Sequence, residues 1–119
     1  MLSLGTHPRV FVARDPLDMR GSFDAVAGRV RRLGLDPLDG HLYVFLSKRR
    51  HMAVVLGFDG SGWCLFRKRL ESGTFQLPEV PDDASRVAVD GRVLAALLSG
   101  IDLRAPRRRW YDRYAGRGT

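Results

Sequence analysis

Residues 40–69 read GHLYVFLSKRRHMAVVLGFDGSGWCLFRKR and decide the fold. Three strand-like runs lie in this stretch, at residues 41–46, 52–58 and 63–69. A charged segment at 47–51 separates the first two runs, and an Asp-Gly-Ser-Gly turn separates the last two. Short β-branched and aromatic runs interrupted by such turns are typical of antiparallel hairpins. The stretch therefore predicts a three-stranded meander.

Upstream of the meander, the sequence predicts a strand at residues 9–13 and a helix from about 19 to 33. The apolar residues of the helix recur at helical spacing and form one stripe. They are Phe23, Val26, Ala27, Val30 and Leu33. Asp18 precedes the helix as a candidate N-cap, and Gly34 follows it as a C-terminal stop.

Downstream of the meander, residues 74–77 are expected to add a short edge strand, and residues 78–86 read as a proline- and acid-rich loop. A second helix is predicted over about 91–99, with Asp90 as its N-cap and Gly100 as its stop. The predicted order is β-α-β-β-β-(β)-α. This is an α+β fold with an antiparallel sheet of about four to five strands and two helices packed on one face.

The length of 119 residues indicates one domain, which we assign to residues 1–104, followed by a basic tail at 105–119. The single cysteine, Cys64, excludes an intramolecular disulfide and fits a reducing compartment. No apolar run reaches the roughly 18 residues that a membrane helix needs. The N-terminal residues also lack a basic segment followed by a long apolar core. We therefore expect a cytoplasmic protein with no membrane partner.

The net charge of +7 is concentrated at the C-terminus. Residues 104–119 hold six arginines and one aspartate, so this segment carries +5. Its densest run is Arg107, Arg108 and Arg109, which we take as a candidate DNA-binding arm. Two alternatives remain open. The tail is a solvated segment without a partner, or the arginine bias, with only two lysines among 20 basic residues, is compositional.

Two further clusters of three cations lie inside the meander. They are Lys48, Arg49 and Arg50 in the first turn, and Arg67, Lys68 and Arg69 at the end of the third strand. In an antiparallel meander these two positions return to the same edge of the sheet. We expect them to form one basic rim that binds phosphates without reading bases.

Aromatic side chains accompany the second cluster. Trp63 and Leu65 share a strand face with Arg67 and Arg69, and Tyr43 and Phe45 join that face in one register. Aromatics beside arginines suit base stacking on single strands. The favoured alternative is that the C-terminal segment or a partner chain covers this face.

The sequence predicts no catalytic residue, no metal ligand and no cofactor. It has no CxxC or HxxxH pair and no glycine-rich phosphate loop. We interpret the histidines as structural or surface residues. The carboxylates of Asp59, Asp82, Asp83 and Asp102 would be needed for a Mg²⁺-dependent nuclease. A turn and a solvated loop explain the first three, and the chain is short for a transposase catalytic core.

Ordered blocks spread over residues 8–104 carry a family resemblance. They are Asp18-Met19-Arg20 with Phe23-Asp24, then residues 40–45, then DGSGWCLFRKRLESGTF at 59–75, then Leu97-Leu98-Ser99-Gly100-Ile101-Asp102. In these the chain resembles the accessory protein TnpB, the second open reading frame product, of IS66-type insertion sequences. That family is distinct from the RNA-guided nuclease of the same name. His51 departs from the family pattern, which has an acidic residue there.

The resemblance implies a role in transposition beside a separate transposase, and it carries over no catalytic residues. The leading hypothesis is a non-enzymatic accessory protein that binds DNA electrostatically, binds the transposase, or does both. The alternative is a pure protein-interaction module that docks on the transposase without touching DNA. The sequence leaves the oligomeric state open, including a homo-oligomer.

Overall fold

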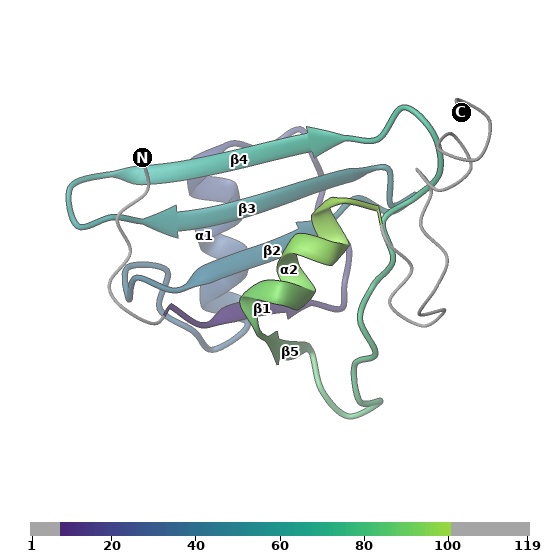
Figure 1. Cartoon of the computed structure of the whole chain (residues 1–119). Coiled ribbons are helices and arrows are strands. Elements are labelled where there is room, and N and C mark those ends of the chain that lie inside the picture. Colours follow the sequence, from purple (N-terminus) through teal and green to yellow (C-terminus); the bar gives the residue numbers. More distant parts are fainter. Residues whose placement is uncertain (1–7, 101–119) are drawn as a thin grey trace.

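The computed structural model describes residues 8–100, which form a five-stranded sheet with one helix on each face (Figure 1). The strands lie in the spatial order β4-β3-β2-β1-β5. In chain order the elements are β1 (Val10–Ala13), α1 (Phe23–Arg32), β2 (Leu42–Leu46), β3 (Met52–Phe58), β4 (Trp63–Arg69), β5 (Arg86–Val89) and α2 (Gly91–Leu98).

The α+β class and the order of the elements are confirmed, but the sheet is mixed rather than purely antiparallel. β1 and β2 are neighbours that run parallel, and the other three neighbouring pairs run antiparallel. The physical reason is the connection through α1. A helical crossover returns the chain to the end at which the first strand began, so the next strand pairs with it in the same direction.

The expectation that both helices cover one face is wrong, because α1 and α2 lie on opposite faces (Figure 1). On β2, Tyr43 and Phe45 pack in the cluster that contains α1, whereas Val44 and Leu46 pack in the cluster that contains α2. Each of these four side chains is at most 3% exposed. A strand that is apolar at every position indicates a sheet buried on both faces.

The helix ends partly follow the sequence prediction. α1 begins at Phe23 rather than near residue 19, and Ser22 occupies the N-cap position. Asp18 is not the cap, because its carboxylate accepts a hydrogen bond from the Arg20 amide instead. The cap of α2 is confirmed, since the Asp90 carboxylate accepts a bond from the Val93 amide at 2.9 Å.

The fifth strand lies elsewhere than expected. Residues 74–77 form no strand; Phe75 is fully buried in the core on the α2 side instead. The fifth strand is β5, which forms one edge of the sheet beside β1 and begins where the predicted loop ended. In the part of the chain that the structure covers, neither helix is long and apolar enough to cross a membrane.

Candidate nucleic-acid interface

Three consecutive cations project from the turn between β2 and β3, and we call Lys48, Arg49 and Arg50 the basic tip. All three are exposed. The turn is closed at its base by Ser47, whose amide donates to the Met52 carbonyl at 2.9 Å and whose hydroxyl accepts from the Met52 amide at 3.1 Å. The backbone of the tip is therefore fixed while its side chains remain in solvent.

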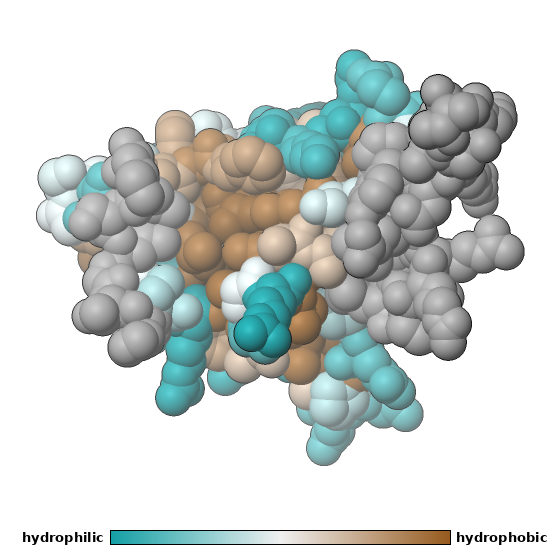
Figure 2. Space-filling view, in the orientation of Figure 1, coloured by the Kyte–Doolittle hydropathy of each residue, from teal (hydrophilic) through white to brown (hydrophobic). Residues whose placement is uncertain are grey.

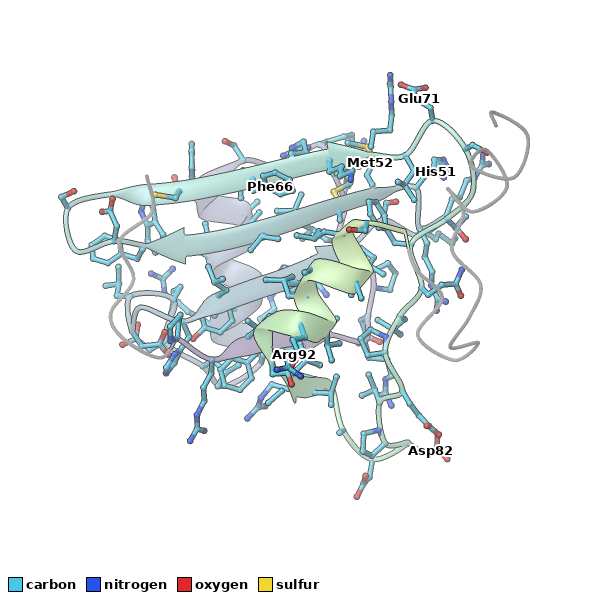
Figure 3. All side chains as sticks on the ribbon, viewed as in Figure 1. His51, Met52, Phe66, Glu71, Asp82 and Arg92 are labelled. Atoms are coloured by element: carbon cyan, nitrogen blue, oxygen red, sulfur yellow. The ribbon has the colours of Figure 1, made fainter. Side chains whose placement is uncertain are left out.

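The segment after β4 supports the basic tip from the side. The Leu70 amide donates to the His51 carbonyl at 2.9 Å, and the Phe75 amide donates to the Arg50 carbonyl at 2.6 Å. Because the Phe75 side chain is fully buried, it anchors these contacts to the core. Figure 3 shows His51 and Glu71 at the same end of the sheet. Arg50 has a φ of 62°, in the left-handed region that favours glycine.

The register brings one cation of β4 to this end. Arg69 lies opposite Met52, the first residue of β3, as the meander predicted. We call the basic tip together with Arg69 the basic rim. Arg69 forms an ion pair with Glu71 at 3.4 Å, and both side chains are more than 60% exposed. Among the described residues, Glu71 is the only acid that forms an ion pair with a rim cation.

The other two cations of β4 have structural partners. Arg67 donates to the carbonyls of Met19 and Gly21, at 2.7 and 3.0 Å, so it holds the segment that leads into α1. Lys68 points to the opposite face and donates to the Leu98 carbonyl at 2.7 Å, at the C-terminal end of α2. A cation there satisfies an unpaired carbonyl and complements the helix dipole. Of the six cations predicted to form the rim, Arg67 and Lys68 thus hold backbone carbonyls, although Arg67 itself is exposed, and the other four make up the basic rim.

Three more arginine side chains donate to backbone carbonyls, and the sequence predicts none of these contacts. Arg86 donates to the Leu33 carbonyl at 2.7 Å, at the C-terminal end of α1. Arg14 donates to the Asp82 carbonyl at 2.8 Å, and Arg29 donates to the Pro16 carbonyl at 2.9 Å. Spacing along the chain gives no signal for these contacts, because each one joins residues that are distant in sequence.

The aromatic face is covered, as the favoured alternative required, but the cover is α1 rather than the C-terminal segment or a partner chain. Tyr43 and Phe45 are fully buried there. The Tyr43 hydroxyl donates to the Asp39 carboxylate at 2.5 Å and contacts the Asp36 carbonyl at 3.0 Å. Burial, followed by the bond to Asp39, raises the pKa of Tyr43. These rings therefore do not form a stacking platform for bases.

The carboxylates do not assemble a site in the described residues. Asp59 accepts bonds from the Ser61 and Gly62 amides, and these bonds lower the pKa of Asp59. Its role is to close the turn between β3 and β4. Across residues 8–100, no group of three His, Cys, Asp or Glu side chains is arranged to hold a metal ion. Asp102 and the candidate arm of Arg107, Arg108 and Arg109 lie outside the described residues.

Fold and surface together define a small α+β domain that presents a basic tip at one end of its sheet. The chain belongs to the IS66 Orf2-like family, whose model (TnpB_IS66, "IS66 Orf2 like protein") matches residues 8–108. This membership makes it an accessory-type protein of an insertion sequence, as the resemblance implied.

Two relatives from Sinorhizobium fredii extend the comparison. The chain is 42% identical to the uncharacterized protein y4hO over 111 residues, which is 92% of this chain and 95% of the relative. It is 35% identical to the uncharacterized protein y4jC over 95 residues, which is 79% of this chain and 80% of that protein. No solved structure matches the chain.

Proposed function

We propose that this protein supports transposition by holding DNA through the basic rim, without catalysing a reaction itself. The observation that carries the proposal is the basic tip. It presents three exposed cations on a turn whose backbone is hydrogen-bonded on both sides. A turn with a fixed backbone loses little backbone freedom when its cations meet phosphates. Arg69 adds a fourth charge at the same end of the sheet.

The proposed contact is with the phosphate backbone rather than with bases. The short turn places three cations side by side, which suits contact with phosphates. Of the aromatic residues that would stack on bases, Tyr43 and Phe45 are buried under α1 and Trp63 is partly buried against the same cluster. Binding of this kind is weakly sequence-dependent and is weakened steeply by salt. Its role would be to hold DNA close to the separate transposase in the cytoplasm.

The tail is proposed as a second arm. The domain is assigned to residues 1–104, and residues 105–119 carry Arg107, Arg108 and Arg109. Truncation after residue 104 should lower the affinity for DNA relative to the full chain. It should not change the thermal unfolding of the domain. A truncated protein that binds DNA as tightly as the full chain would remove the arm from the proposal.

The test is fluorescence anisotropy of the full chain on two labelled duplexes, an insertion-sequence end and a scrambled control, across a salt series. We expect similar affinities for both. In the triple variant K48A/R49A/R50A, the log–log salt slope should become shallower by about 2 to 3, since each lost phosphate contact removes about 0.9. The matched control R31A/R32A removes two exposed cations from the last turn of α1. It should change the slope far less.

The alternative function is docking on the transposase without DNA contact. Pull-down of the purified transposase by wild-type protein and by K48A/R49A/R50A separates the two. Retained capture by the triple variant, with no DNA binding by the wild type at low salt, would favour the docking function and overturn the DNA-holding proposal.

A further inference from the structure

β4 is an edge strand that is long enough to pair with another chain. Within the described part of the protein, the sheet ends at β4, and its seven residues have β3 on one side only (Figure 1). The pair His51–Leu70 is hydrogen-bonded, so alternation along the ladder directs the amides of Cys64, Phe66 and Lys68 toward β3. The amide groups of Leu65 and Arg67 therefore point to the free edge.

The side chain at the centre of this strand is apolar and exposed. Phe66 is 50% exposed, on the face of the sheet that carries α2 (Figure 3). It borders a groove of about 220 Å³ that is also lined by Leu42, Val55, Gly57, Cys64 and Leu98. Figure 2 shows this hydrophobic surface beside α2. Phe66 and the lining of this groove form one contiguous apolar surface, which is the kind of surface that meets a partner.

We propose that the partner is a second copy of this chain, whose β4 pairs antiparallel with β4 about a two-fold axis at Phe66. Phe66 is the middle residue of the strand, so this axis pairs the strand along its whole length. Each Phe66 then faces the Phe66 of the other copy in a non-hydrogen-bonded pair, where side chains approach most closely. Leu65 and Arg67 of the two copies exchange the free backbone hydrogen bonds.

The charge pattern of β4 supports a second copy of the chain as the partner. The first half of the strand is Trp63-Cys64-Leu65, and the second half is Arg67-Lys68-Arg69. In the antiparallel register every cation lies opposite an apolar residue of the other copy, with Arg69 opposite Trp63, a favourable cation–π pair. Parallel pairing in register would instead place each cation opposite its own copy, which is destabilising. The strand is thus complementary to itself in one direction only.

The test is sedimentation velocity of the full chain over a concentration series from micromolar to submillimolar. We expect a reversible dimer. The single variants F66K and F66E should each weaken dimerisation at least about tenfold, because two like charges then meet at the axis. An equimolar mixture of F66K and F66E should restore the dimer. Leu38→Lys is the matched control, because Leu38 is 49% exposed and lies away from β4.

A covalent readout covers the case in which the charged variants are misfolded. The double variant C64S/F66C should form a disulfide-linked dimer under mild oxidation, since a cysteine pair facing across a non-hydrogen-bonded position lies within bonding reach. L38C/C64S should remain monomeric under the same conditions. Circular dichroism of each variant establishes that the fold is retained.

Three results would overturn the proposal. One is a wild-type chain that stays monomeric across the series. Another is a dimer that F66K and F66E leave unchanged. The third is a monomeric chain whose F66K variant loses capture by the purified transposase, which would assign this surface to the transposase instead.

Discussion

The basic tip and the cations of β4 are equally charged in the sequence, yet the structure uses them differently. The tip holds its charges outward on a turn fixed by backbone bonds. On β4, Arg67 donates to backbone carbonyls of the segment before α1, and Lys68 donates to the last residue of α2. A cluster of cations is therefore available to a ligand only where its side chains have no acceptors within the protein.

The largest expected effect on stability comes from Lys68. Lys68→Met keeps the length of the side chain but removes the charged bond to the Leu98 carbonyl, which is partly buried. The free energy of unfolding should fall by about 1.5 to 2 kcal/mol. Lys48→Met, at the basic tip, should change it by less than about 0.5 kcal/mol. Urea denaturation measures both, and equal losses would contradict the division between the two regions.

Arg67 gives the next largest effect. Its guanidinium reaches the Met19 and Gly21 carbonyls together, and a lysine ammonium lacks that planar fork. Arg67→Lys should lower the free energy of unfolding by about 1 kcal/mol. Arg49→Lys at the tip should be neutral in the same thermal unfolding experiment. A neutral Arg67→Lys would show that one carbonyl contact suffices.

A substitution at Arg50 is expected to raise the free energy of unfolding, whereas those at Lys68 and Arg67 lower it. The left-handed backbone of Arg50 suits glycine, so Arg50→Gly should stabilise the fold by about 0.5 to 1 kcal/mol while it weakens DNA binding. Arg49→Gly removes the same charge without that backbone relief and should not stabilise. Parallel thermal melts and anisotropy titrations check both readouts. Loss of stability in Arg50→Gly would mean that its side chain supports the turn.

The smallest effect concerns pH in the segment that Arg67 holds. Hydrogen bonds from Arg20 lower the pKa of Asp18 from 3.8 to about 2. A depressed pKa in the folded state contributes stability that is present above pH 3.8 and is lost as the pH falls toward 2. Asp18→Asn should therefore lower the stability slightly at pH 7, and its difference from the wild type should shrink as the pH falls through this window. Acid unfolding of the two proteins, followed by circular dichroism, measures the difference.

The sequence predicts the local elements better than their arrangement. The alternation of turns and apolar runs locates β2, β3 and β4, and Asp90 correctly marks the start of α2. The parallel pairing of β1 with β2 and the placement of helices on opposite faces depend on long-range packing. One signal was available, since β2 and β3 are apolar at nearly every position and so require cover on both faces.

At the candidate site, too, the sequence predicts local positions but not long-range contacts. Position in the meander placed Arg69 beside the basic tip correctly. It gave no information on the carbonyls that Arg67 and Lys68 hold, because Met19 and Leu98 come to β4 only through the packing of both helices. Residue type and spacing locate charge, and tertiary contacts decide which charges remain available.

The most direct test of the central claim is an amide ¹⁵N–¹H chemical-shift titration of the full chain with a short DNA duplex at low salt. We expect shifts concentrated at residues 47–51 and 69–74, with little change at Arg31 and Arg32 on α1. Shifts centred on α1, or no shift within the domain, would contradict the assignment of the basic rim as the DNA-holding surface.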